Sequence, residues 1–279
     1  MLTRSLLTVI ATLLILSGCG EAQQSAKMLN LPAQDGYTGI PVIAVAEAAT
    51  PATPDNIHPQ QSIPFLMGQS AQEKQFVTID ERYASRKDMT LQAEVYDAFK
   101  KMHKAAEKDG IQLVIKSATR NFDYQKQIWD GKWTGARKVE GKDLSKTISN
   151  PVQRALKILE NSSMPGSSRH HWGTDIDLNA FTNDYFSSGK GKQEYAWLQA
   201  NAARFGFCQP YTRKGDGRDS GYNEERWHWT YMPLSKPYTV DAIQLLKNNM
   251  FRDFKGAETA ASVGIVENYV AGINKQCLQ

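Results

Sequence analysis

Apolar residues between positions 89 and 109 recur in steps of three and four. This period places them on one face of a helix, and Gly110 provides a suitable end. The pattern therefore predicts a helix over residues 89–109 with one buried stripe. The residues of this stripe are Leu91, Val95, Phe99, Met102 and Ala106.

Short β-branched and aromatic runs alternate with further helical segments along the rest of the chain. Because the elements mix without regular βαβ units, we predict an α+β fold in which helices flank a small antiparallel sheet. The predicted strands span residues 111–117, 173–179 and 226–232. Helices are predicted at the end of residues 119–131, over residues 152–159 and 191–205, and once or twice after Tyr238.

The first 18 residues have the layout of a secretory signal peptide. Arg4 gives a basic start, and the apolar run that follows is too short to span a bilayer comfortably. Leu16-Ser17-Gly18-Cys19 resembles a bacterial lipobox, which implies cleavage before Cys19 and lipidation of its thiol. The alternative is an ordinary signal peptide with an incidental cysteine. We expect a periplasmic, lipid-anchored protein of the cell envelope, at the outer membrane if the host is Gram-negative.

Residues 19–75 are rich in alanine, glutamine, proline and threonine and carry little periodic apolar signal. This composition predicts a flexible tether with some ordered contacts near its end. The folded domain is expected over residues 76–237. A C-terminal helical extension over residues 238–279 is expected to pack on that domain.

Composition and charge narrow the classes of partner. Hydrophobic residues make up 41% of the 279 residues, which allows a sizeable core. The net charge of +4 is only mildly basic, and no stripe of lysine and arginine interleaved with aromatic residues occurs. Nucleic-acid binding is therefore not expected, and no pattern indicates an oligomeric state.

Three cysteines are present, and no CxxC spacing supports a thiolate metal site. If Cys19 is acylated, Cys208 and Cys277 remain. An exported compartment is oxidising, so these two can form a disulfide that ties the C-terminal tail to the domain. Two separate buried thiols are the alternative.

Three of the five histidines lie in two short segments with polar and aromatic residues. His170 and His171 belong to SRHHWGTDID, and His228 belongs to ERWHW. Neutral imidazole and carboxylate are good zinc ligands, and two histidines with one carboxylate leave a position for water. Taken alone, these residues indicate either a catalytic metal site or buried histidines that are merely packed and hydrogen-bonded.

The two segments resemble motifs of a known peptidase family. SRHHWGTDID is similar to SxHxxGxAxD, and ERWHW is similar to ExWH, of the zinc D-alanyl-D-alanine carboxypeptidases. SATRNFDYQ, upstream, is similar to the SGYRSxxxQ segment of the same family. The three matches occur in family order over residues 117–229. The resemblance implies a hedgehog/D,D-peptidase-like fold with a zinc cleft on the sheet.

The resemblance also implies roles for individual residues. Glu225 is expected to be the general base, and Arg120 is expected to stabilise the oxyanion or to bind the peptide carboxylate. Ser168 and Gln125 are expected to contact substrate in the cleft. The implied zinc ligands are His170, Asp177 and His228.

Two positions stay open. Asp175 stands where the family has alanine, and on a strand it shares a face with Asp177, so it either orients a ligand histidine or competes as the ligand. We favour Asp177 because its offset from His170 fits the motif. His171 is interpreted as a neighbour of the site. On an extended strand Glu225 and His228 would face opposite sides, so either the chain turns between them or only His228 lies in the strand.

The family implies a zinc-dependent carboxypeptidase that removes a terminal D-alanine from peptidoglycan stem peptides, at a D,D or an L,D bond. One alternative is an endopeptidase that cuts cross-links. Another is a non-catalytic lipoprotein that binds wall peptides. The presence of Glu225 together with all three expected ligands favours an enzyme.

Overall fold

The computed structural model describes residues 59–70 and 75–279, and all of them belong to one compact unit, Pro54–Gln279. The expected signal peptide, Cys19 and most of the expected tether lie outside the described residues. Within the described part of the chain, no helix has the length and apolar character needed to cross a membrane.

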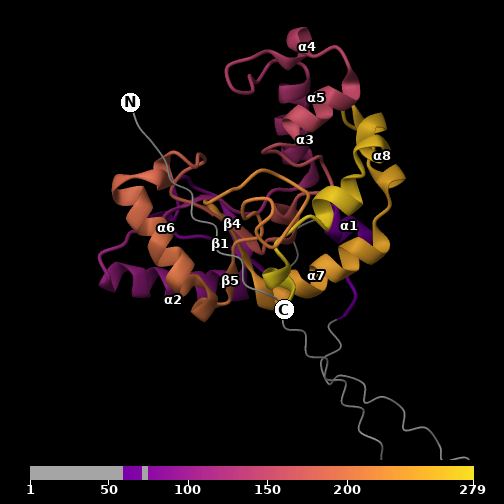
Figure 1. Cartoon of the computed structure of the whole chain (residues 1–279). Helices are drawn as coiled ribbons and strands as arrows, with labels where there is room; N and C mark the ends of the chain where they lie inside the picture. Colours follow the sequence, from indigo (N-terminus) through magenta and orange to yellow (C-terminus); the bar gives the residue numbers. More distant parts are fainter. Residues whose placement is uncertain (1–58, 71–74) are drawn as a thin grey trace, which may run out of the picture. The chain divides into compact units, whose positions relative to one another are not determined.

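The predicted α+β fold is confirmed (Figure 1). Its strands form a four-stranded antiparallel sheet in the order β3-β4-β6-β5 and a two-stranded antiparallel sheet, β1-β2. The strands are β1 (Phe76–Thr78), β2 (Thr90–Gln92), β3 (Ile115–Ser117), β4 (Asp175–Leu178), β5 (Phe207–Cys208) and β6 (His228–Tyr231).

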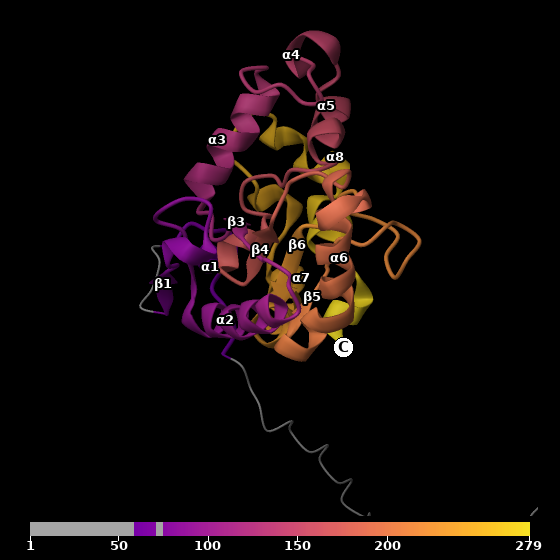
Figure 2. The ribbon, with the colours of Figure 1, turned by 90° about the vertical axis from the view of Figure 1, so that its left-hand side faces the viewer.

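Helices surround the larger sheet and extend beyond it (Figures 1 and 2). The α-helices are α1 (Ile63–Leu66), α2 (Ala93–Lys108), α3 (Phe122–Trp133), α4 (Leu144–Thr147), α5 (Pro151–Ile158), α6 (Gly189–Asn201), α7 (Met232–Leu245) and α8 (Ala260–Val263). Shorter helical segments are η1 (Glu81–Tyr83), η2 (Arg169–Trp172), η3 (Tyr185–Ser187), η4 (Ala202–Phe205), η5 (Asn248–Met250), η6 (Ala257–Thr259), η7 (Ile265–Val270) and η8 (Lys275–Leu278).

The two faces of the larger sheet have different chemistry because side chains alternate along each strand. Ile176 and Leu178 of β4 and Trp229 of β6 point into a core that they share with α2 and α6. The alternate residues of these strands therefore lie on the other face. That face carries Asp175, Asp177, His228 and Thr230.

A second core lies among α3, α5, α7 and the C-terminal segment. Phe122 and Trp129 of α3 pack in it together with Ile158 of α5 and with Phe254 and Val263 near the C-terminus. Residues after position 237 therefore contribute to the interior of the domain. The expected boundary at residue 237 is wrong in detail because it falls inside α7.

Helix α7 begins at Met232, earlier than the sequence indicates, and it contains two prolines in its first half. Pro233 occupies the first turn, where its missing N–H has no helical partner in any case. Pro237 lies inside the helix, where it normally discourages helix formation. The sequence pattern predicted a strand up to residue 232 and helix from Tyr238, whereas the structure places residues 232–237 in α7.

Helical structure also occurs before the expected boundary at residue 76. Ser62 caps α1 by accepting a hydrogen bond from the N–H of Phe65, and Phe65, Leu66 and Met67 are buried. The carbonyl of Leu66 accepts a hydrogen bond from the indole N–H of Trp172 at 3.0 Å. Four apolar residues are too few to show a helical period, so the sequence pattern missed this element.

Cys208 and Cys277 form a disulfide, which is the first of the two alternatives that the sequence left open. Cys208 lies at the end of β5, and Cys277 lies in η8. Asn274 adds to this attachment, since its backbone N–H donates to the carbonyl of Pro210 at 2.8 Å. The C-terminal tail is thus tied to the segment that leads from β5 toward β6.

Candidate metal centre and substrate cleft

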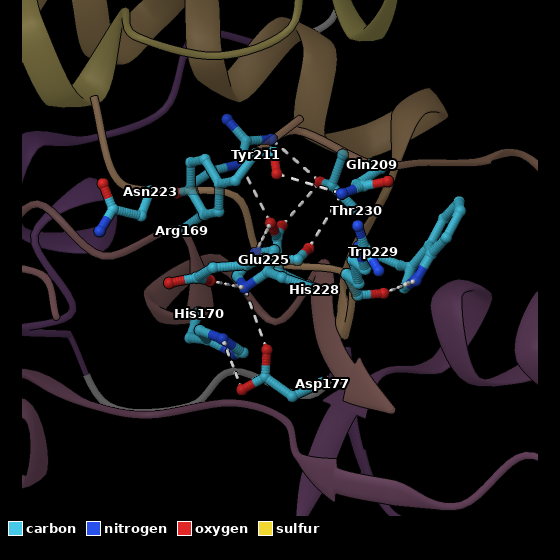
Figure 3. Close-up of polar contacts among 12 residues, drawn as sticks. Arg169, His170, Asp177, Gln209, Tyr211, Asn223, Glu225, His228, Trp229 and Thr230 are labelled. Atoms are coloured by element: carbon cyan, nitrogen blue, oxygen red, sulfur yellow. Dashed lines mark hydrogen bonds and ion pairs between the residues drawn. The ribbon is translucent and has the colours of Figure 1, made fainter. Parts of the chain in front are cut away.

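Three buried side chains converge on the polar face of the sheet (Figure 3). Asp177 of β4 pairs in register with His228 of β6, so their side chains stand side by side. His170 comes from η2, the short helix that leads into β4. One ligand atom from each of the three lies within 4.8 Å of the other two.

Hydrogen bonds on the outer side of each imidazole fix which nitrogen faces the centre. Nδ1 of His170 lies 2.8 Å from the carbonyl oxygen of Ala118, so this nitrogen carries the proton and Nε2 keeps its lone pair. Nε2 of His228 donates to the Asp175 carboxylate at 2.8 Å, which leaves Nδ1 of neutral His228 facing Asp177. Such outer partners orient metal-binding histidines in proteins.

Asp175 is fully occupied by this orienting role. Besides His228, it accepts hydrogen bonds from Nε of Arg169 at 3.0 Å, Oγ1 of Thr174 at 2.6 Å and Oγ1 of Thr230 at 2.7 Å. Burial alone would raise the pKa of Asp175, but the Arg169 charge and the bond from His228 hold that pKa well below its usual range. Both carboxylate oxygens are thus engaged away from the centre.

Asp177 has the opposite environment. Its carboxylate lies 3.2 Å from Nε2 of His170 and 3.0 Å from Nδ1 of His228. Oδ1 of Asp177 and Nε2 of His170 are nevertheless buried without a hydrogen bond of acceptable geometry. Orphaned acceptor atoms of this kind are costly unless a ligand completes them. The residues therefore fit a metal ion held by two imidazoles and one carboxylate.

The charges at the centre also favour a cation. Burial alone would lower the pKa of His228, but its hydrogen bond to Asp175 and the adjacent Asp177 carboxylate outweigh burial and raise the pKa to about 9. Burial would likewise raise the pKa of Asp177, and the neighbouring imidazoles instead hold it far below its usual range. The Asp175 and Asp177 carboxylates stabilise positive charge at this centre, which either a proton on His228 or a bound metal ion would supply.

Glu225 lies beside this group without belonging to it. The strand begins at His228, and the N–H of His228 bonds to the carbonyl of Glu225 at 3.3 Å, so the chain turns between the two residues. Oε2 of Glu225 consequently lies 3.5 Å from Nδ1 of His228. Burial, with the nearby Asp177 charge adding to it, raises the pKa of Glu225 to about 7.

His171 has no free nitrogen for a metal. Its Nδ1 donates to the carbonyl of Arg120 at 2.6 Å, and its Nε2 accepts from the N–H of Gly166 at 3.0 Å. Burial lowers the pKa of His171 to about 3, in keeping with a neutral ring. Gly68 allows this arrangement, since a Cβ there would lie 2.5 Å from Nδ1 of His171. His171 thus fixes the backbone that carries Arg120.

A cavity of about 410 Å³ opens over the centre. Besides atoms of His170, Asp177 and Tyr222, three further buried polar atoms of its lining have no hydrogen-bond partner: Nε of Arg120, Oγ of Ser168 and Oε1 of Gln125. The cavity wall therefore offers both donors and acceptors to a polar ligand. It contains all the cleft residues that the sequence predicted: Arg120, Gln125, Ser168, His170, Asp177, Glu225 and His228.

Sequence reasoning missed several residues of the site. Arg169 stands inside the histidine motif, yet only the structure shows its bond to Asp175 and a second bond to Thr230 at 2.9 Å. The ring of Tyr211 packs against His228 with centroids 4.7 Å apart. Lys132 and Arg137 also line the cleft. Lys132 lies seven residues after Gln125 on one helical face, a spacing that could have indicated it.

The part of the chain that forms this cleft matches a known protein family. The profile of the VanY family, described as D-alanyl-D-alanine carboxypeptidase, matches residues 88–234, just over half of the 279-residue chain. This chain belongs to the VanY family. The resemblance drawn from the sequence motifs is thereby confirmed. The matched range contains every cleft residue that the motifs predicted.

Curated VanY-like relatives are moderately similar. The chain is 28% identical over 210 residues to YodJ of Bacillus subtilis, an inferred carboxypeptidase, with 73% of this chain and 65% of that protein covered. It is 29% identical over 130 residues to a D-alanyl-D-alanine carboxypeptidase of Enterococcus faecalis, with 47% and 44% covered. The chain thus spans less than two thirds of each of these relatives.

Solved structures show more distant similarity. VanYB in complex with D-alanine-D-alanine is 24% identical, with a TM-score of 0.41 over 56% of this chain and 80% of that one. The LD-carboxypeptidase LdcB is 23% identical, with a TM-score of 0.45 over 69% and 80%. A vancomycin-resistance D,D-pentapeptidase in complex with Zn(II) is 23% identical, with a TM-score of 0.41 over 59% and 88%.

Proposed function

We propose that this protein is a zinc-dependent carboxypeptidase that removes a terminal D-alanine from peptidoglycan stem peptides. One observation carries the proposal. In a chain of the VanY family, a buried His170–Asp177–His228 group lies at the floor of a cleft, and the carboxylate of Glu225 lies 3.5 Å from one of its members.

His170, Asp177 and His228 would hold the zinc ion. When bound there, zinc supplies a Lewis acid that makes water a better nucleophile near neutral pH and polarises a carbonyl group. Glu225 takes the proton from the attacking water and passes it to the leaving amine, which its place beside His228 allows. Asp175 keeps the ring of His228 in position throughout.

The cleft wall binds and orients the substrate. The guanidinium of Arg120 has an unpartnered Nε and can bind the terminal carboxylate or the oxyanion that forms at the scissile carbon. Oγ of Ser168 is free to bond the substrate near the centre. The amide nitrogen of Gln125 is held by the carbonyl of Ser163 at 2.8 Å, so its free Oε1 faces the cleft as an acceptor for a peptide N–H.

The decisive experiment is incubation of the purified protein with defined muropeptides, read by mass spectrometry with and without a chelator. Carboxypeptidase action gives a mass loss of one alanine, and endopeptidase action separates cross-linked dimers. We expect loss of alanine that stops on chelation and returns with zinc. Products that persist after complete removal of divalent metal would refute the metal-dependent mechanism.

Glu225→Gln tests the general base separately. It keeps the size and hydrogen-bonding ability of the side chain but cannot accept a proton. We expect full zinc content and a kcat/KM reduced by roughly 10²–10⁴-fold. Zinc content by elemental analysis and kcat/KM on the same muropeptide are measured together. Near-normal turnover in this variant would remove Glu225 from the mechanism and leave the metal site intact.

The cellular location is part of the proposal and rests on the lipobox-like segment ending at Cys19. A lipid on Cys19 would hold the protein at a membrane facing the cell wall. Cys19→Ser should therefore abolish membrane fractionation or processing, as followed by immunoblotting of cell fractions. A variant that is processed normally and still sediments with membranes would contradict the anchor.

A further inference from the structure

The cleft continues along α3, away from the metal centre, to a basic end. Gln125, Ile128 and Lys132 lie on one face of α3 and line the cavity. Seven residues separate Gln125 from Lys132, which corresponds to roughly 10 Å along a helix axis. Arg137, just beyond the end of α3, lines the same end of the cavity. Figure 2 shows α3 rising from the sheet toward α4, with α5 beside it.

The cations at this end form no direct ion pair within the described part of the chain, and the nearby anion that acts on Lys132 is the Glu225 carboxylate of the metal end. Within the described residues, neither Lys132 nor Arg137 forms an ion pair with a carboxylate. Nζ of Lys132 donates only to the hydroxyl of Ser162, a neutral group. Burial lowers the pKa of Lys132 because it removes water from the ammonium group, and the Glu225 charge only partly offsets this. An anion bound here would relieve that cost.

Arg137 is held over the same helix by a local feature of the sequence. Gly131 lies within α3, where glycine normally costs about 0.5–1 kcal/mol relative to alanine. A Cβ at Gly131 would lie 3.0 Å from Cγ and 3.1 Å from Cδ of Arg137, so glycine makes room for the arginine stem. The N–H of Arg137 also bonds to the carbonyl of Gly131 at 2.7 Å. Arg137 is thereby directed along α3.

We propose that Lys132 and Arg137 form a subsite for a second carboxylate of the substrate, distinct from the group that Arg120 binds beside the metal centre. The inference rests on the proposed function for the position of the scissile bond. It narrows the substrate class to acidic peptides, in which a free carboxylate lies several residues from that bond. A neutral or amidated peptide of the same length leaves the partly buried Lys132 without a bound anion.

The test uses binding, so that it does not depend on turnover. The zinc-loaded Glu225→Gln protein is titrated by calorimetry with pentapeptides that end in D-alanyl-D-alanine. In three of them a single glutamate occupies the first, second or third position and glutamine fills the other two. In the fourth, all three positions are glutamine. At one position we expect glutamate to bind roughly tenfold or more tightly than glutamine, as for a hydrogen bond to a buried charge.

Variants assign that preference to the subsite. Added to Glu225→Gln, Lys132→Met should reduce the preference to less than about threefold, and Arg137→Gln should reduce it partly. Lys104→Met, an exposed lysine of α2, is the matched control and should leave the preference unchanged. Zinc content and melting temperature verify folding. If Lys132→Met does not fold, Arg137→Gln still tests the subsite, because Arg137 is exposed and its replacement leaves the interior intact.

A preference below twofold at every position in the parent protein would overturn the subsite, as would a full preference in both Lys132→Met and Arg137→Gln. Hydrolysis of the all-glutamine peptide by the native protein tests the proposed function alone. A protein that hydrolyses this peptide but shows no acidic preference keeps the proposed function and loses the subsite. A protein that shows the preference but no hydrolysis has the subsite and lacks the activity.

Discussion

The two ends of the cleft are built in opposite ways. At the metal end, the atoms of His170 and His228 that point away from the centre are bonded to Ala118 and to Asp175. Along α3, Oε1 of Gln125 is buried without a partner, and Lys132 contacts only a serine hydroxyl. The ligand side chains at the metal end are therefore oriented by the protein before any ligand binds, whereas the polar groups along α3 have few protein partners that would orient them.

This difference has an energetic consequence. Asp175 bonds to four side chains, so a change there disturbs a buried network and reaches the geometry of the centre. Arg120 has a backbone tie through His171, while its Nε bonds to nothing. A change in the Arg120 side chain should therefore weaken binding or conversion of the substrate, while the fold and the metal site stay in place. Three predictions follow from this contrast, in order of decreasing effect on activity.

The largest effect is expected for His228→Ala, which removes one of the three expected metal ligands. It should abolish stoichiometric zinc binding and reduce turnover to background, because the metal loses one of three protein ligands. Elemental analysis and the muropeptide assay measure the two losses. His103→Ala, on α2 outside this cleft, is the matched control. Retention of one zinc per chain in His228→Ala would exclude this ligand set.

Arg120→Ala should have an intermediate effect confined to catalysis. We expect kcat/KM to fall by about 10²–10³-fold, as for loss of a donor to a developing oxyanion, with unchanged zinc content and melting temperature. The exposed Arg82→Ala serves as a control for loss of a positive charge. A large fall in melting temperature would mean that the Arg120 side chain supports the fold, contrary to the contrast drawn above.

Asp175→Asn should act through the metal and have the smallest effect at saturating zinc. An amide has one acceptor oxygen where the carboxylate has two, and its NH₂ group would face a donor such as Arg169 or Thr230. We expect zinc affinity to fall roughly 10–100-fold and excess zinc to restore most activity. Competition with a chelator of known affinity measures this. Unaltered affinity, equal to that of the exposed control Asp97→Asn, would show that Asp175 does not support the site.

Much of the fold was predictable where local pattern and packing agree. The stripe from Val95 to Ala106 predicted α2, and the alternation around Trp229 predicted β6. The predicted helix began too early, since Leu91 lies in β2. The pattern failed where an element is short or contains proline. Helix α1 depends on burial of Phe65 and Leu66 against distant residues, and α7 forms although Pro237 lies inside it. In both cases tertiary contacts outweigh weak or contrary local preference.

The cleft residues were identified through the family motifs, while their partners were not. A motif marks residue types at fixed spacing, but it does not show which side chain meets Arg169 or what lies beside Gln125. Lys132 and Arg137 belong to no motif used in the sequence analysis, and they join the cleft only because α3 runs along it. Contacts between residues far apart in the chain depend on how helices pack, which local spacing does not specify.

The sequence by itself determined the chemistry of this protein: two histidines, a carboxylate and a glutamate in the order and spacing of a VanY-type site. The spacing of the family motif favoured Asp177 over Asp175, but the strand period alone does not separate them, because residues two apart on a strand share a face. The register of β4 and β6 separates them. It sets Asp177 opposite His228 and Asp175 opposite Thr230, so one carboxylate faces the centre and the other is held by hydroxyl groups and Arg169. Register arises from pairing across the sheet, and only the folded structure contains it.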